Sequence, residues 1–180
     1  MKRTTHQTLS AMRQQIRAWS SGEARPDVRV LVYEPEHEPL MLQRLAECAS
    51  ELAAEGMPVE LVDIGQGFLH EIERRNDFAE RLSQAEQQDP WRARNDMHQI
   101  ADRYLKKLLA TPVEPPVVCR IMINTGSLAT IVSLSAVTNE FYGEDRCPSP
   151  NILAFPGEGD DRSLNLLRLR TDTNYRVARI

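Results

Sequence analysis

Carboxylate side chains follow three short apolar runs of the sequence, each close to the point where the run ends. The set consists of Glu34, Asp63, Glu158, Asp160 and Asp161. Carboxylates within ~4 Å of shared divalent ions support phosphodiester hydrolysis. A nuclease site would normally add a lysine or histidine near the last run, but Lys2, Lys106 and Lys107 are all distant from it. We favour solvated loop carboxylates without a metal, with a metal-dependent nuclease or phosphoesterase as the alternative.

A second candidate is the stretch NTGS at residues 124–127, which offers one glycine at the predicted start of a helix. Phosphate-binding loops use several glycines, so that backbone N–H groups can surround the anion, and usually a lysine. The chain contains neither GxxxxGKS/T nor GxGxxG, and the segment EPEHEP after the first apolar run would repel phosphate. We expect a tight turn in which Thr125 or Ser127 caps the helix. A nucleotide sensor that binds at residues 124–127, which include Asn124, Thr125 and Gly126, is the alternative.

Nucleophilic catalysis has little support in the sequence, which contains no GxSxG motif. The histidines are His6, His37, His70 and His98. All except His37 lie on or beside predicted helices with polar neighbours, as surface histidines do. His37 stands between two glutamates, which favour its protonated form. Cys119 lies inside an apolar run, where burial raises the pKa of a thiol and makes it inert. We therefore predict no catalytic residue and no cofactor.

Arginines concentrate near the C-terminus. They are Arg162, Arg168, Arg170, Arg176 and Arg179. Arg168 and Arg170 would share one face of a strand, where they could bind phosphates or an acidic partner surface. An exposed edge strand protected from aggregation by charge is the competing interpretation. Tyr175 stands beside Arg176, and such aromatic–arginine pairs are common in protein interfaces.

Alternating strands and helices must position these residues. Compact apolar runs predict strands at residues 28–35, 57–65, 117–126 and 151–157. Apolar residues at helical spacing predict helices at residues 9–19, 38–56, 68–88, 91–110 and 127–143. Two short strands are predicted at 163–170 and 174–180. Strand–helix–strand units give parallel strands, so we predict an α/β fold with a Rossmann-like, mostly parallel sheet, flanking helices and C-terminal edge strands.

The 180 residues are expected to form one domain. Residues 1–25 would hold an N-terminal helix, and residues 66–110 would form a helical insert on the sheet, because this region is long for one crossover. Ligands of such sheets bind at the carboxyl ends of the strands. The polar residues predicted at that rim are Glu34, Asp63, Asn124, Thr125 and Gly126, and the question is whether they converge.

Composition narrows the class of protein. A net charge of −4 argues against a stand-alone nucleic-acid binder, although a local basic patch remains compatible with it. Three widely spaced cysteines fit reduced thiols. The polar N-terminal stretch contains no secretory signal, and no apolar run approaches the ~18 residues of a membrane span. We expect a cytoplasmic protein without a membrane partner.

Four stretches, taken in order, resemble the BrxB family of bacterial BREX phage-defence systems. They are VLVYEP in the first strand, NTGSLATIVSLSAV after the third, ILAFPGE on the fourth and NYRVARI at the end. The resemblance covers nearly the whole chain. The family's terminal signature corresponds here to Phe155–Glu158, followed by Leu164, Leu166 and Leu169 and then by Tyr175 and Arg176. The chain departs from the family pattern at Glu34, Ala129, Thr130, Ser133 and Asn174.

The resemblance implies a non-catalytic adaptor or scaffold in a multi-protein defence complex. Its partners would be an AAA-type ATPase, an alkaline-phosphatase-like protein and a DNA methyltransferase, and DNA would be contacted only indirectly. Function would then depend on two surfaces. One is the helical insert with the pair Trp91 and Arg92, and the other is the C-terminal strands with Arg168, Arg170, Tyr175 and Arg176.

The stretch Pro156-Gly157-Glu158 is expected to be structural first. Gly157 would supply a turn with positive φ, a conformation that glycine adopts readily. Glu158 would pair with Arg176 or another arginine and hold the last strand on the sheet. No metal ligand is expected in this stretch.

Overall fold

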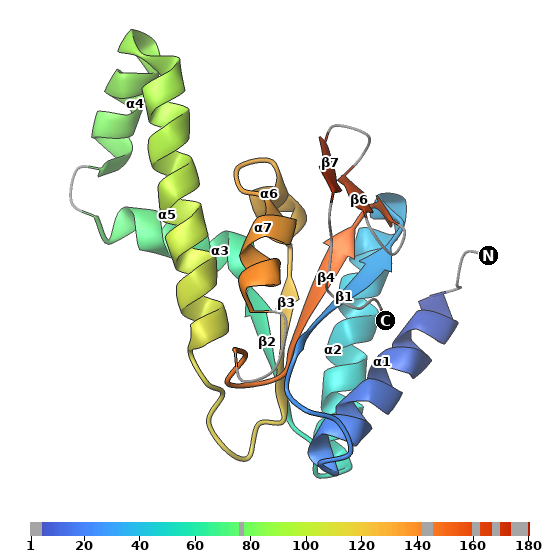
Figure 1. The fold of residues 1–180 in the computed structure, drawn as a ribbon. Coiled ribbons are helices and arrows are strands. Elements are labelled where there is room, and N and C mark those ends of the chain that lie inside the picture. The colour runs from blue at the N-terminus through green and yellow to red at the C-terminus, as the bar shows by residue number, and fades with distance from the viewer. Residues whose placement is uncertain (1–4, 76–77, 142–145, 160–162, 167–169, 174–179) are drawn as a thin grey trace.

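The computed structural model describes residues 5–75, 78–141, 146–159, 163–166, 170–173 and 180. Its centre is a four-stranded, all-parallel sheet with the order β1-β4-β3-β2 (Figure 1). The strands are β1 (Val28–Tyr33), β2 (Val59–Asp63), β3 (Cys119–Ile123) and β4 (Asn151–Pro156). This architecture confirms the predicted Rossmann-like α/β fold. The predicted strands were each longer than the observed ones.

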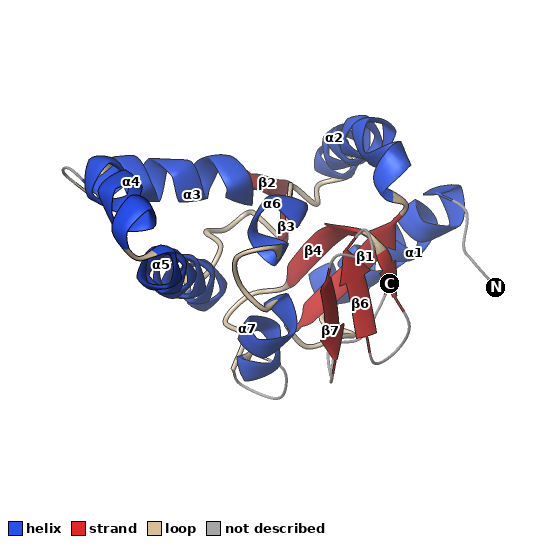
Figure 2. Cartoon of the chain, turned by 90° about the horizontal axis from the view of Figure 1, so that it is seen from above, coloured by secondary structure: helices blue, strands red, loops and turns tan. Residues whose placement is uncertain are grey.

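Helices cover both faces of the sheet, which explains why its strands are apolar runs without strict alternation. One face carries α1 (Thr5–Ser20) and α2 (Glu38–Ala54), with the short 3-10 helix η1 (Pro35–His37) leading into α2. The other face carries α3 (Ile64–Glu73), α5 (Pro90–Ala110), α6 (Gly126–Ala129) and α7 (Leu134–Glu140). Figure 2 shows the sheet between α1 and α2 on one side and α5 and α7 on the other.

Two hydrophobic clusters hold these layers together. Alternate residues of β1 belong to different clusters, with Val30 facing the α5 side and Leu31 the α1 side. Ile16 of α1 and Leu45 of α2 are fully buried in the second cluster, and Leu105 of α5 is buried in the first. Two-sided burial of this kind fixes the register of the strands, because a shift by one residue would exchange the two faces.

The region between β2 and β3 is helical, as predicted, but it contains three helices instead of two. The helix predicted at 68–88 is two helices, α3, which ends at Glu73, and α4 (Phe78–Gln88). The C-terminal half of α5 packs in the core, where Ile100, Leu105 and Leu109 are buried. The other half pairs with α4 as a helical hairpin that projects beyond the sheet (Figure 1).

The single helix predicted at 127–143 is also interrupted. The short α6 ends at Ala129, and α7 starts only at Leu134, after Ser133. The side-chain oxygen of Ser133 accepts a hydrogen bond from the Ala136 N–H at 3.2 Å and caps α7. The β-branched residues Thr130, Ile131 and Val132 have low helix propensity, which favours a break there. Residues 142–145, including the predicted helix stop at Gly143, lie outside the described residues.

The C-terminal part forms a second, three-stranded antiparallel sheet beyond the carboxyl ends of β1 and β4 (Figure 1). Its strands are β5 (Glu158–Gly159), β6 (Ser163–Leu166) and β7 (Arg170–Thr173). The strand predicted at 163–170 therefore ends four residues early, and β7 begins where the prediction ended. The strand predicted at 174–180 lies outside the described residues except Ile180, whose N–H donates to the Val30 carbonyl at 3.0 Å. No described helix has the length and apolar character of a membrane span.

Candidate functional site

The carboxyl edge of the parallel sheet does not gather the predicted carboxylates at one point. Glu34 follows β1 and Asp63 ends β2, and these strands are the two edges of the sheet. With β4 and β3 between them, a strand spacing of ~4.8 Å places the two backbones about 14 Å apart. Glu158 lies in β5, paired with Asn165 of β6. Asp160 and Asp161 lie outside the described residues.

Asp63 and Asn124, by contrast, do meet at the ends of β2 and β3. The Asn124 side-chain amide donates to Asp63 Oδ2 at 2.6 Å. Asp63 Oδ1 accepts from the Gln66 N–H at 2.9 Å and so caps α3. Both carboxylate oxygens are therefore engaged within the chain, and Asp63 serves to join α3 to the end of β3.

Two glycines that the sequence analysis did not single out make this junction possible. A Cβ on Gly65 would lie 2.9 Å from Ser127 Oγ, and a Cβ on Gly67 would lie 2.0 Å from the Tyr104 hydroxyl oxygen. Gly65 and Gly67 thus allow α6 and α5 to approach α3. The signal available in the sequence was the pattern DIGQG directly after a strand, in which two glycines occupy a helix where alanine would normally be more stable.

In the NTGS turn Thr125 is the N-cap residue of α6, as predicted, but its side chain makes no capping hydrogen bond. Thr125 is fully buried and its hydroxyl donates to the Ala154 carbonyl at 2.7 Å, while the Ser127 hydroxyl donates to the Asn124 carbonyl at 2.7 Å. Asn124 itself has φ of 57°, a left-handed conformation that asparagine tolerates better than most residues. Gly126 opens α6, a helix of one turn.

At the opposite edge, Glu34 belongs to a small exposed group with Glu36 and His37. One ligand-type atom from each of the three lies within 4.8 Å of the others. His37 Nδ1 is 3.5 Å from Glu34 Oε2. These three side chains come from one turn of the chain, at η1. Among the described residues they form a group with the donor types and the spacing of a metal site.

The turn at Pro156-Gly157-Glu158 ties the two sheets together. Pro156 is the last residue of β4, opposite Tyr33, and the buried Gly157 donates its N–H to the Tyr33 carbonyl at 2.8 Å. The prediction that Gly157 adopts a positive φ is wrong. Among the described glycines, the ones with a positive φ are Gly22 and Gly56. Gly157 instead continues the β1–β4 pairing by one residue.

The pairing of Glu158 with Arg176 stays a prediction, since Arg176 lies outside the described residues. The same holds for Arg168 and Tyr175. Arg170 is the first residue of β7 and lies opposite Leu166 of β6. The structure therefore places one of these four C-terminal positions, on an antiparallel strand next to α7.

Trp91 is the most exposed large apolar side chain in the described part of the chain, at 77%. It lies in the first turn of α5, near the outer end of the α4–α5 hairpin. Asp89 Oδ1 accepts from the Arg92 N–H at 3.1 Å, so the pair Trp91 and Arg92 stands on a capped helix start. The hairpin thus presents Trp91 to solvent without burying it against the body of the protein.

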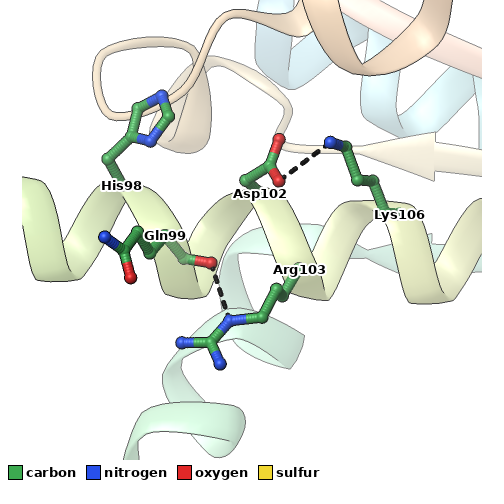
Figure 3. A pocket seen from close by; sticks show the side chains of 5 residues that line it. All are labelled: His98, Gln99, Asp102, Arg103 and Lys106. Atoms are coloured by element: carbon green, nitrogen blue, oxygen red, sulfur yellow. Dashed lines mark hydrogen bonds and ion pairs between the residues drawn. The ribbon is translucent and has the colours of Figure 1, made fainter. Parts of the chain in front are cut away.

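A shallow pocket lies farther along the same helix. It is lined by His98, Gln99, Asp102, Arg103 and Lys106 (Figure 3). Lys106 Nζ is 2.8 Å from Glu140 Oε1 of α7 and 3.0 Å from Asp102 Oδ2, and these two partners raise its pKa, Glu140 most strongly. The Arg103 Nε–H donates to the Gln99 carbonyl at 3.1 Å, on a different side of the helix from the Asp102–Lys106 pair (Figure 3).

Buried thiols and surface histidines agree with the expectations from sequence. Cys119 is fully buried, and desolvation, with a smaller effect of Cys48, raises the pKa of its thiol to about 12. His6, His70 and His98 are exposed, as predicted. Comparison of the chain with protein-family models, with curated proteins and with solved structures gave no match.

Proposed function

We propose that this protein is an adaptor or scaffold subunit of a BREX-type phage-defence complex. The proposal depends on the resemblance to BrxB proteins in the order of four sequence stretches. Its partners would be the AAA-type ATPase, the alkaline-phosphatase-like protein and the DNA methyltransferase that the resemblance implies. The adaptor would act in the cytoplasm and bind through its surfaces.

The observation that supports this proposal best is the exposure of Trp91 on a projecting hairpin. An exposed tryptophan next to an arginine is the composition of an interaction hot spot, because it can bury a large apolar area when a partner covers it. The rim polar groups Asp63, Asn124 and Thr125 support the same view, since their side chains bond within the chain. Trp91 has no such structural role among the described residues.

Affinity purification of the tagged protein from a host that carries its neighbouring genes tests the proposal. We expect the wild-type protein to retain at least one of the three named partners, and Trp91→Ser to retain markedly less of it. Leu40→Ser is the matched control, because Leu40 is an exposed apolar residue, at 46%, on α2 at the other face of the sheet. Recovery of none of the three partners by the wild-type protein would contradict the adaptor function.

The second candidate function is metal-dependent hydrolysis, and the observation in its favour is the group Glu34, Glu36 and His37. Two carboxylates and an imidazole can hold a divalent transition-metal ion. Calorimetric titration with Mn²⁺ and Mg²⁺ decides between the two functions. Saturable heat that disappears in Glu34→Gln would favour the hydrolase, whereas a silent titration would remove it.

A further inference from the structure

The solvent-facing side of α5 carries three exposed cations on the side opposite its buried residues. Residues at helical spacing form a continuous exposed row, which we name the α5 stripe: Arg92, Asn95, Gln99, Arg103 and Lys107. Arg94 is also exposed, but two residues after Arg92 it lies on another side of the helix. The helix also carries two partly exposed carboxylates: Asp96, four residues after Arg92 on the same face, and Asp102, which is bound to Lys106.

The arginines of α1 and α2, at the other face of the sheet, are arranged differently. On α1 and α2, Arg13 pairs with Glu51, Arg17 with Glu55 and Arg44 with Glu47. Each of these arginines thus has a carboxylate partner. In contrast, Arg92, Arg94 and Lys107 have no ion pair with any described residue, and Arg103 bonds only to a backbone carbonyl of its own helix. The positive charge of α5 is therefore available to an external anion.

From these observations we propose that the α5 stripe binds the phosphate backbone of a DNA duplex. Lys107 follows Arg92 by fifteen positions, so the stripe is about 22 Å long at a rise of about 1.5 Å per residue. That length matches a rigid, regularly charged rod better than a compact acidic patch. The amides of Asn95 and Gln99 lie between the cations, and Arg, Lys, Asn and Gln are all donors to phosphate oxygens.

The position of α5 and the charge of the chain agree with such a contact. The first half of α5 projects beyond the sheet with α4 (Figure 1), and the second half, which carries Arg103 and Lys107, packs on the sheet with the stripe on the side turned away from its buried residues. The whole chain has a net charge of −4, which would repel DNA elsewhere and restrict the contact to this helix. The inference goes beyond the proposed adaptor function, in which DNA is contacted only through partners.

Fluorescence anisotropy with a short labelled DNA duplex of mixed sequence tests the inference on the full-length protein. The logarithm of the binding constant should fall linearly with the logarithm of salt concentration, by about 0.9 per phosphate contacted, between about 50 and 200 mM salt. Replacing Arg92, Arg103 and Lys107 together by glutamine should weaken binding at least about tenfold at the lower salt and flatten the slope by about 2 to 3. Glutamine is a good helix former, so the variant should remain folded, which circular dichroism checks.

The matched control removes three cations from the opposite side: Arg17→Gln, Arg25→Gln and Arg44→Gln in one protein. It should bind the duplex as the wild-type protein does. Three results would overturn the inference: no binding by the wild type at low salt, equal losses in both triple variants, or displacement of the duplex by poly-glutamate at equal charge concentration, which would indicate an acidic protein partner. Trp91 is retained throughout, so failure here leaves the partner purification result unaffected.

Discussion

Individual polar residues at the sheet edge bond mostly within the chain. Asp63 is the clearest case, because one carboxylate caps α3 and also holds the amide of Asn124. The sequence indicated that Asp63 and Asn124 would both stand at the rim, since each follows an apolar run. It did not indicate that they would bind each other, because that contact depends on β2 and β3 being neighbours, and on the close approach allowed by Gly65.

Replacing Asp63 by alanine should destabilise the protein more than replacing Asp89 by alanine. Both aspartates cap a helix, and loss of a cap typically costs about 1 kcal/mol. Asp63 also accepts from Asn124, so we expect a total loss of about 2 kcal/mol once a hydrogen bond to a charged group is included. Urea denaturation of the two variants measures the difference. Equal losses would mean that the Asp63–Asn124 bond contributes no net stability.

The Cys119 thiol should make folding stability depend on pH in the alkaline range. Its pKa is raised by burial from 9.0 to about 12. Below a pH of about 9 the thiol holds its proton in both the folded and the unfolded chain, so the free energy of unfolding keeps its full value. As pH rises toward the higher value, the unfolded chain loses the proton first, so the free energy of unfolding falls by up to about 1.4 kcal/mol per pH unit.

Urea denaturation of the wild-type protein and of Cys119→Val, at several pH values from roughly 8 to 10.5, isolates this contribution. Tyr33 and Tyr104, whose pKa values are also raised by burial, remain in both proteins and cancel in the comparison. The variant should lose stability less steeply than the wild type above about pH 9. Parallel curves would show that Cys119 does not titrate between the two states as its burial implies.

At the level of elements, local pattern predicted the strands of the parallel sheet and the helices α1, α2 and α5 well. Each has a strong periodic or continuous apolar signal. The prediction failed where a break depends on contacts. Between α6 and α7, apolar residues continue at helical spacing, but Ser133 caps a new helix there. The short strands β5 to β7 have weak individual signals, and the boundary at Arg170 is set by pairing with β6.

One buried arginine joins three of these elements. Arg120 of β3 is 4% exposed and its Nε–H donates to Glu60 Oε2 of β2 at 2.8 Å. Its Nη1 donates to the carbonyls of Leu108 at 2.6 Å and of Thr111 at 3.2 Å, at the C-terminal end of α5. A cation at this position also interacts favourably with the helix dipole. Arg120 therefore fixes α5, and with it the hairpin, to the edge of the sheet.

Arg120→Met should cost about 2 to 4 kcal/mol, because the Leu108 and Thr111 carbonyls lose their buried donor. Arg120→Lys should be intermediate, since an ammonium cannot reproduce the fork of a guanidinium. Glu60→Gln is the control for the ion pair alone and should cost about 1 kcal/mol or less, as Glu60 is partly exposed. Chemical denaturation of the three variants gives the order. If Glu60→Gln lowered the free energy of unfolding as much as Arg120→Met does, the stabilisation would come from the ion pair and not from the hydrogen bonds to the end of α5.

For the whole molecule, strand order decides which distant residues meet, and local pattern does not contain it. The sequence predicted parallel strands, yet β1 and β2, which are consecutive in the chain, lie at opposite edges of the sheet. Glu34 and Asp63 are separated for this reason. The uneven pairing of surface charge is a second property of this scale. It appears only when the arginines of α1 and α2, which pair with carboxylates of α2 and its C-cap, are compared with the exposed cations on the outer side of α5.

The two tryptophans of the chain differ strongly in their exposure to solvent. Trp19, in the last turn of α1, is 7% exposed and its indole N–H donates to the Arg25 carbonyl at 3.0 Å, whereas Trp91 is 77% exposed on the hairpin. Acrylamide quenching of intrinsic fluorescence should therefore resolve an accessible and a protected component. Trp91→Phe should abolish the accessible component, and Trp19→Phe should leave it in place. If Trp91 lies in a protein interface, addition of the bound partner should protect it in the Trp19→Phe protein; quenching that stays unchanged in the complex would place the interface elsewhere.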